Sequence, residues 1–311
     1  MSGAKINQAE YIKESNFILA QKGKTFFWAK FLLNKKHANK AVRLYRFCRY
    51  VDDLGDDATD LAIARLMLMQ IIEDLKLGSS DHPIISDAIA LFSESKIEIS
   101  IPISLIQGVI SDLNSVRIKD KAELIIYCYQ VAGTVGLMMS KILDVTDERA
   151  LSHAIDLGMA MQMTNISRDV GDDAQMNRRY LPSSLMGDID PSAMNNPSIQ
   201  NQQKLRFTVA QILNTAEDYY QSGYAGLCFL PVRARLGIAI ASGLYRQIGI
   251  NLIRRNYESW LFRSIVSKKQ KGWLTLKIVT SCLLDRKFYF YLEPHRSRLD
   301  DSIKKVVYAH A

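Results

Sequence analysis

The sequence is poor in residues that interrupt helices and in the motifs of several common enzyme classes. Its 311 residues include only seven prolines, which leaves long stretches free to be helical. The five histidines (His37, His82, His153, His295 and His310) form no HExxH or ExxH pair, which argues against zinc hydrolysis and di-iron chemistry. The sequence also lacks a P-loop, a GxSxG elbow and a GxGxxG, so it offers no motif for nucleotide binding or serine hydrolysis.

Cysteines and long apolar runs are also scarce. The four cysteines, Cys48, Cys128, Cys228 and Cys282, lie far apart among apolar or aromatic neighbours and form no CxxC pair, as reduced core thiols do. The N-terminus has no apolar signal-peptide core, and no uninterrupted apolar run approaches the roughly 18 residues of a membrane span. We therefore expect a cytoplasmic protein, with peripheral contact with a membrane surface as an alternative.

The positive charge is concentrated near the C-terminus. The net charge is +8, and residues 251–311 carry 13 Lys/Arg against 5 Asp/Glu, whereas the first 250 residues carry 27 of each sign. A basic C-terminal fifth on a neutral body suggests an anionic partner, such as a polyphosphate substrate or an acidic membrane surface. The alternative is a solvated basic helix face. We expect no nucleic-acid partner.

Apolar residues recur at a spacing close to 3.6 almost throughout, which predicts an all-α fold. The polar stretch 185–204, which contains two prolines, is predicted to be the one long irregular segment, either a connector or a lid. No repeat or linker stands out, so we expect one domain over 1–311. Helices are predicted over residues 7–22, 24–33, 38–55, 59–77, 83–95, 102–115, 120–142, 148–175, 202–225, 229–256 and 267–285.

Two acidic segments, YRFCRYVDDLGDD from residue 45 and QMTNISRDVGDD from residue 162, contain the most informative pattern. In a helix, Asp52 and Asp56 lie one turn apart on the same face, and so do Asp169 and Asp173. Carboxylates about 6 Å apart repel by roughly 3 kcal/mol at an effective dielectric near 20. Next to apolar residues, such pairs need a cation.

Magnesium is the cation that fits these segments best. Asn165 precedes Asp169 by four residues, so an amide and two carboxylates share one stripe and offer all-oxygen ligation to Mg²⁺, with Mn²⁺ as an alternative. Each segment also has an arginine, Arg49 and Arg168, that can pair with a carboxylate or fork onto a phosphate. A single acidic pair is usually a solvated helix face, but two pairs with arginines favour a magnesium and diphosphate site.

At this point the chain resembles the squalene/phytoene synthase family, which joins two prenyl diphosphates head to head. The resemblance is carried by CRYVDD with Asp56, YCYQVAGTVGLMM at 127–139, and QMTNISRDVGDDA followed by NRRYLP within 162–182. It extends through GKTFFWA, GVISDL and the segment that begins YYQSGYAG at residue 219. It covers about 20–285, with a basic tail over 286–311, and is nearest to the bacterial phytoene synthases of the family.

The resemblance implies an isoprenoid (terpenoid) synthase fold, a helical bundle around a central apolar cavity with the two acidic helices facing each other at its mouth. The metal ligands that it implies are Asp52, Asp56, Asn165, Asp169 and Asp173. The catalytic residues would be the same four aspartates with Tyr45, Tyr127 and Tyr245. The substrate-binding residues would be Arg49, Gln162, Asn165, Arg168, Arg178, Arg263, Lys271, Ala132, Val135 and Gly136.

The cavity walls are expected from two helices, 127–142 and 151–164. Their apolar residues would be ordinary core without the resemblance. The candidates are Val131, Ala132, Val135, Leu137, Met138, Leu157, Met159 and Met163.

The activity that the resemblance implies is magnesium-dependent condensation of two geranylgeranyl diphosphates to phytoene, through the cyclopropyl intermediate prephytoene diphosphate. The first alternative is the same scaffold acting on farnesyl diphosphate to give squalene, dehydrosqualene or presqualene diphosphate. The second is a non-catalytic helical adaptor, which would predict decay of acidic motifs that are intact here. The sequence does not determine the oligomeric state.

Overall fold

The computed structural model describes residues 8–23, 26–27, 30–292 and 294–295. In this part of the chain no β-strand forms, and one isolated bridge joins Arg117 to Arg179, so the all-α prediction is confirmed. The elements are α1 (Gln8–Lys22), α3 (Lys35–Asp56), α4 (Leu61–Leu77), α5 (Pro83–Glu94), α6 (Ser100–Asp112), α7 (Lys121–Cys128), η1 (Tyr129–Gly133), α8 (Thr134–Ile142), α9 (Arg149–Arg168), α10 (Val170–Gln175), α11 (Ser183–Met186), α12 (Ser192–Asn195), α13 (Ile199–Ala225), η2 (Gly226–Phe229), α14 (Val232–Arg254), α15 (Lys268–Leu284) and η3 (Arg286–Phe288).

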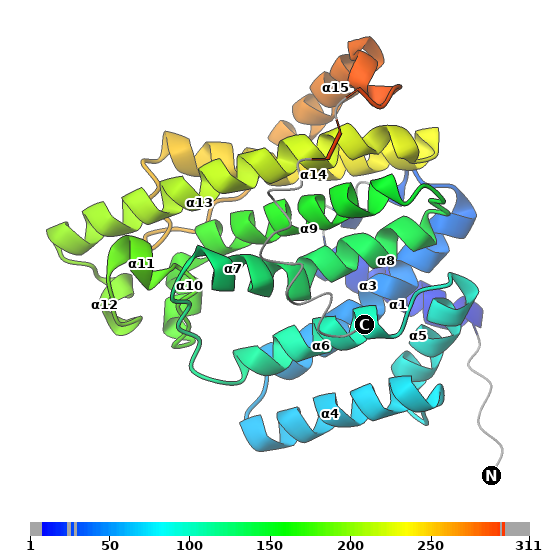
Figure 1. Ribbon diagram of the computed structural model, residues 1–311, viewed down its shortest axis with the longest axis horizontal. Helices are drawn as coiled ribbons and strands as arrows, with labels where there is room; N and C mark the ends of the chain where they lie inside the picture. The colour runs from blue at the N-terminus through cyan, green and yellow to red at the C-terminus, as the bar shows by residue number, and fades with distance from the viewer. Residues whose placement is uncertain (1–7, 24–25, 28–29, 293, 296–311) are drawn as a thin grey trace.

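The helix α9 runs through the middle of the bundle. It packs against α13 and α14 on one side and against α8 on the other. Figure 1 shows α4 at one edge of the molecule and α15 at the opposite edge. The two acidic segments lie on α3 and on α9–α10. The packing of these helices therefore determines how close the two sets of carboxylates lie.

Local sequence signals set several helix starts. The side chain of Asn34 accepts a hydrogen bond from the backbone N–H of His37 at 2.8 Å. At the start of α15, Ser267 and Gln270 form a reciprocal capping box. Each such cap stabilises its helix by about 1 kcal/mol. The helix starts therefore follow from short polar residues just before apolar stretches.

Two packed cores flank the middle of the bundle. One is formed mainly by the four helices α3, α4, α5 and α6. It includes the perpendicular rings of Phe47 on α3 and Phe92 on α5, whose centroids lie 5.2 Å apart. The other surrounds α9 and α13 and includes the fully buried Met159 and Met163. The four cysteines form no disulfide. Cys128 and Cys282 are buried, as predicted for core thiols, whereas Cys48 and Cys228 are partly exposed.

Close approach of α8 and α9 depends on two glycines. A Cβ atom at Gly136 would lie 2.1 Å from the carbonyl oxygen of Ala154, and one at Gly158 would lie 2.2 Å from the carbonyl oxygen of Ala132. Neither backbone oxygen can move without displacing its helix. Small residues are therefore required here for one helix to reach the other.

Several predicted boundaries were wrong. The helix predicted over 148–175 ends at Arg168, and Asp169 separates it from α10. The stretch 185–204 is not irregular throughout, because it contains α12 and the first turns of α13, which Ser198 caps. Part of the helix predicted over 24–33, and residues 296–311 of the expected basic tail, lie outside the described residues.

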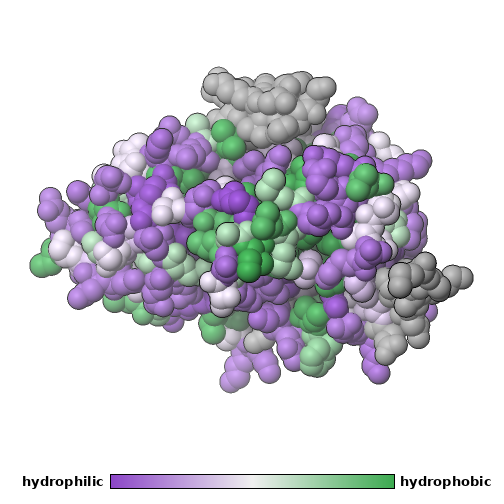
Figure 2. Space-filling model, turned by 90° about the horizontal axis from the view of Figure 1, so that it is seen from below, coloured by the Kyte–Doolittle hydropathy of each residue, from purple (hydrophilic) through white to green (hydrophobic). Residues whose placement is uncertain are grey.

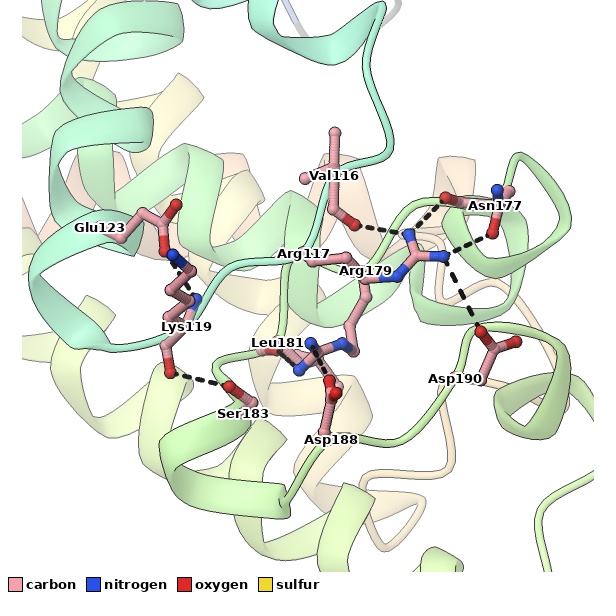
Figure 3. A network of polar contacts seen from close by, with 10 residues as sticks. All are labelled: Val116, Arg117, Lys119, Glu123, Asn177, Arg179, Leu181, Ser183, Asp188 and Asp190. Carbon is pink, nitrogen blue, oxygen red and sulfur yellow. Dashed lines mark hydrogen bonds and ion pairs between the residues drawn. The ribbon is translucent and has the colours of Figure 1, made fainter.

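Arginine side chains fasten the segment that follows α10. Arg179 donates to the carboxylate of Asp188 at 2.8 Å, and Arg117 donates to the carbonyl oxygen of Asn177 at 2.7 Å. Figure 3 shows Arg117 also reaching toward Asp190, at 3.9 Å. These contacts hold the start of the 185–204 stretch against the segment before α7.

The helix α4 exposes an apolar face. Apolar side chains gather on the side of the molecule seen in Figure 2, which is the side where α4 lies in Figure 1. The exposed apolar residues of α4 are Leu61, Ile63, Leu66, Met67, Met69 and Leu77.

Two helical stretches, Lys121–Ile142 and Val232–Arg254, are long and apolar enough to cross a membrane by length and composition. About half of the apolar window of each, 44% and 56%, is buried inside the bundle. Core helices of this kind pass the same test, and both stretches contribute walls to the cavity described below.

We predict that Gly136→Ala destabilises the protein by about 1–3 kcal/mol, because the new methyl group would meet a backbone oxygen that cannot yield. Urea unfolding followed by circular dichroism measures the effect. The matched control is Gly272→Ala in α15, where a Cβ atom meets nothing within 4 Å. Alanine there should leave stability unchanged or raise it by up to about 1 kcal/mol. Equal effects of the two substitutions would contradict the close-packing argument.

Candidate functional site

A cavity of about 880 Å³ lies between α3, α8, α9 and α14. One end is polar and opens toward solvent, where the side chain of Arg263 is 57% exposed. The polar residues that line this end are Tyr45, Arg49, Asp52, Gln162, Asn165, Arg168, Arg263, Lys268 and Lys271. The other end is apolar and is lined by Leu143, Val145, Ala150, Leu227, Leu230 and Ile238.

The first acidic segment places its carboxylates in different environments. Asp52 lines the cavity, and burial, with the neighbouring Asp56 carboxylate, raises its pKa from 3.8 to about 7. The Asp56 side chain accepts a hydrogen bond from Arg178 at 2.7 Å. Arg49, which also lines the cavity, pairs with Asp53. Of the carboxylates in this segment, Asp52 is therefore the one that lines the cavity.

The second acidic segment follows the break at the end of α9. Asp169 pairs with Arg168 and with Arg263, whose Nε lies 2.9 Å from its carboxylate. Arg168 does not pair with Asp172, four residues later, because α9 ends at Arg168 and α10 begins at Val170. Burial, and then the Asp169 carboxylate, raise the pKa of Asp173 well above its ordinary value.

A buried polar cluster links the two segments, and sequence reasoning missed half of it. The carboxylate of Asp112 accepts hydrogen bonds from Tyr127 at 2.9 Å and Tyr180 at 2.8 Å. Burial raises the pKa of Asp112 to about 6, and the charges of Arg178 and Asp56 also act on it. Asp112 and Tyr180 lie within the quoted strings GVISDL and NRRYLP, so the motifs contained them although no role was assigned.

Five predicted site residues do not line the cavity: Asp56, Tyr127, Asp169, Asp173 and Arg178. Tyr127 is buried against Asp112, and Arg178 contacts the Asp56 carboxylate and the Gly55 carbonyl oxygen. Both lie behind the polar end, where they contact acidic residues rather than the cavity. Arg178 follows α10 in an extended stretch, so it points to α3 while Arg179 points the opposite way to Asp188.

The donor set at the polar end suits a hard divalent cation. The Oδ1 atom of Asn165 is buried and has no hydrogen-bond partner, while its amide group donates to Gln162 at 3.2 Å. An unpaired amide oxygen near carboxylates with raised pKa values fits an oxygen-ligated ion. Among the described residues, no three Asp, Glu, His or Cys side chains lie close enough together to hold a metal by themselves. Here Asp56 and Asp169 turn toward arginines instead.

Two of the three predicted tyrosines face the cavity. Tyr45 and Tyr245 line it, and the ring of Tyr245 lies 5.5 Å from that of Phe26. Burial raises the pKa of Tyr45 to about 12 and also raises that of Tyr245. Both phenols are therefore neutral hydrogen-bond donors at neutral pH.

The apolar walls match the expectation in part. Val131, Ala132, Val135, Gly136 and Leu157 line the cavity. The remaining candidates, Leu137, Met138, Met159 and Met163, belong to the packed cores instead. The α8–α9 pair presents only one stripe of each helix to the cavity, and spacing alone did not indicate which one.

Comparison with known proteins is consistent with this geometry. Residues 19–271 match the model of the squalene/phytoene synthase family. The chain is 31% identical to a 15-cis-phytoene synthase of Pantoea ananas, with 89% of this chain and 93% of that protein covered. It is 33% identical to a phytoene synthase of Rhodobacter capsulatus, with 80% and 75% covered.

Among solved structures, the fold resembles that of a dehydrosqualene synthase determined in complex with a ligand. The TM-score is 0.76 at 25% identity, and 89% of this chain and 98% of that chain are covered. It also resembles a squalene synthase from Alicyclobacillus acidocaldarius, with a TM-score of 0.70 at 17% identity and with 82% and 97% covered.

We predict that Asp52→Asn stabilises the metal-free protein by about 2 kcal/mol more at pH 7.5 than at pH 5, because one pKa unit corresponds to about 1.4 kcal/mol. The fold raises the pKa of Asp52 to about 7, so the folded state binds this proton more tightly than the unfolded state. The protonated Asp52 side chain therefore contributes its full stabilisation of the folded state at acidic pH, and this stabilisation is lost as the pH rises toward 7. Asparagine does not ionise, so the variant does not lose this stability. The difference in unfolding free energy between variant and parent, measured by urea titration with a chelator present, should therefore grow from pH 5 to pH 7.5. Asp57→Asn, at an exposed position, is the control and should show no such trend.

Proposed function

We propose that this chain, which belongs to the squalene/phytoene synthase family, condenses two geranylgeranyl diphosphates head to head to phytoene through prephytoene diphosphate. The observation that carries the proposal is the two-ended cavity: the Asp52 carboxylate, arginines and lysines line one end, and apolar residues line the other. A prenyl diphosphate has the same division between an anionic head and a hydrocarbon tail. The identities of 31% and 33% to phytoene synthases support this substrate.

Basic side chains at the polar end would bind the diphosphate. Arg49, Arg168 and Lys271 line the cavity there, and both arginines pair with carboxylates of the acidic segments. An arginine held by a carboxylate is already oriented, so it can turn to a phosphate with little further loss of side-chain freedom. Arg263 spans Asp169 and Asp172 at the solvent edge, where it would cover the bound diphosphate.

We propose that Asp52, Asp56, Asp169, Asp173 and Asn165 hold magnesium, with manganese as an alternative. When bound, the ion would act as a Lewis acid that stabilises the negative charge of the departing diphosphate. The exchange of arginine partners for phosphate would free Asp56 and Asp169 to serve as ligands. The unpaired Oδ1 atom of Asn165 is an oxygen ligand that needs no such exchange.

The apolar end would protect the carbocation left by departure of the diphosphate. Val131, Val135 and Leu157 line the cavity and would exclude the water that quenches the cation. The neutral phenols of Tyr45 and Tyr245 would lie near the reacting carbons, where their rings stabilise positive charge. Their hydroxyl groups could also relay the final proton.

The alternative substrate is farnesyl diphosphate, favoured by the likeness to a dehydrosqualene synthase structure. Incubation with each prenyl diphosphate and magnesium, followed by mass analysis of the product, separates the two. Phytoene from geranylgeranyl diphosphate supports the proposal. A product from farnesyl diphosphate alone would replace it with the alternative.

We predict that Asp52→Ala and Asp169→Ala each lower the rate of diphosphate release by about 100-fold or more. Each removes an oxygen ligand for the cation and leaves the helices in place, so circular dichroism should be unchanged. The measurement is diphosphate release at saturating magnesium. Asp57→Ala on the same helix end should retain the parent rate. Unchanged turnover in either site variant would contradict the assignment.

We also propose cytoplasmic localisation with peripheral binding to an anionic membrane surface through α15. This helix carries Lys268, Lys269, Lys271 and Lys277 and no acidic residue, and it exposes Trp273 and Leu276. Lysines near an anionic surface contribute about 1 kcal/mol each. Because α15 begins at the cavity mouth, where Lys268 and Lys271 line the cavity, it would hold the opening near the lipid source.

We predict that Leu276→Ser weakens flotation of the protein with anionic liposomes, whereas Leu66→Ser does not. The two leucines are similarly exposed, at 64% and 67%, but they lie on α15 and α4, at opposite edges of the molecule. Binding through α15 should also fall as salt rises. Equal loss in the two variants, or binding insensitive to salt, would contradict this proposal.

We further propose that residues 1–311 act as one catalytic domain. The cavity takes its walls from α3 in the N-terminal part, α9 in the middle and α14 in the C-terminal part. Its lining residues run from Gln21 to Lys271, so the cavity draws on most of the chain.

A further inference from the structure

A buried cluster of polar side chains lies at the apolar end of the cavity, away from the acidic segments. His153 lines the cavity there and is 2% exposed. It precedes Asn165 by twelve residues on α9, so the two lie roughly 18 Å apart along the helix. His153 is thus the ionisable residue of α9 that lines the apolar end of the cavity, where the prenyl chain would lie.

Hydrogen bonds determine how the His153 ring is held. Its Nδ1 atom lies 2.8 Å from the carbonyl oxygen of Ser222, which can only accept, so Nδ1 carries the proton. Its Nε2 atom then accepts, and it lies 3.4 Å from the hydroxyl of Tyr291. That hydroxyl accepts in turn from the backbone N–H of His295 at 3.1 Å. Both ring nitrogens are satisfied away from the cavity.

A buried carboxylate fastens the residues behind this ring. Asp156, one turn along α9 from His153, is 0% exposed. Its Oδ2 atom accepts from the Ser222 hydroxyl and lies 2.8 Å from Nε2 of His295. Its Oδ1 atom is buried without a hydrogen-bond partner, so the contacts at Oδ2 are the ones that stabilise this buried carboxylate. The position of His295 is therefore strongly specified.

The chain before His295 is attached at further points on the same side. Arg235 donates to the carbonyl oxygen of Phe288 at 2.6 Å. The guanidinium of Arg149 lies 5.2 Å from the centroids of the Tyr291 and Phe229 rings, which pack 4.8 Å apart. The C-terminal segment is thus packed against the outer side of the His153 ring, whose inner side borders the cavity.

We infer that Asp156, Tyr291 and His295 are positioning residues that hold the His153 ring as the end wall of the cavity, and that this wall limits the length of the prenyl chain. The inference rests on the proposed function. A neutral ring is the form that a hydrocarbon tail can contact, and burial, with His295 nearby, lowers the pKa of His153. Loss of an anchor would let the ring move outward and lengthen the cavity.

The test is the ratio of kcat/KM for geranylfarnesyl diphosphate, one isoprene unit longer, to that for geranylgeranyl diphosphate. His153→Ala removes the wall and should raise this ratio by about tenfold or more, the discrimination that a small change in an apolar pocket provides. His295→Ala and Tyr291→Phe should raise it in the same direction. His295→Gln retains a donor to Asp156 and should restore the parent ratio.

Three outcomes would overturn the inference. Equal losses of kcat/KM for both substrates in His295→Ala, with the ratio unchanged, would show that the anchor only stabilises the fold. The same shift in ratio for His82→Ala, at an exposed histidine stacked on Tyr50, would show that the effect is not local. Absence of diphosphate release by the parent protein from any prenyl diphosphate would refute the proposed function itself, whereas an active parent with unaltered ratios refutes only the end-wall role.

Discussion

The structure depends on keeping like charges together at the edge of an apolar cavity. Asp52, Asp56, Asp169 and Asp173 come from two separate helical regions, and burial raises the pKa of two of them. Their repulsion is offset by arginines, of which Arg178 is the most telling because it joins the end of α3 to the segment after α10. In the described structure Asp56 and Asp169 pair with the protein's own arginines, whereas burial raises the pKa values of Asp52 and Asp173.

The packing of the helices brings the two acidic segments, which are remote in sequence, close together. The α8–α9 contact, which Gly136 and Gly158 permit, gives the cavity a thin wall of backbone rather than a thick wall of side chains. Space is thereby gained for a ligand without enlarging the bundle. Met159 and Met163 lie in the packed core, while Met139 and Met161 of the same two helices line the cavity.

Much of the fold and of the polar end could be predicted from the sequence, because helical periodicity and the spacing of the aspartates are local properties. Asp52, Asn165 and Arg168 do line one cavity, as expected. The roles of Tyr127 and Arg178 could not be predicted in detail, since their contacts depend on Asp112 and Asp56 from other helices. The break at Asp169 was also missed: its sequence continues a helical pattern, and only the tertiary arrangement shows that the helix ends there.

The wide turn η1, over Tyr129–Gly133, has a consequence for the origin of the cavity wall. A π-helical turn accommodates one residue more than an α-helical turn does, and each residue of an α-helix advances its side chain by about 100°. A chain one residue shorter within η1 could close into a regular helix, and everything after it would rotate by about that angle. Val135 and Gly136 would then face elsewhere. The extra residue of this π-helical turn therefore decides which side chains of α8 line the cavity.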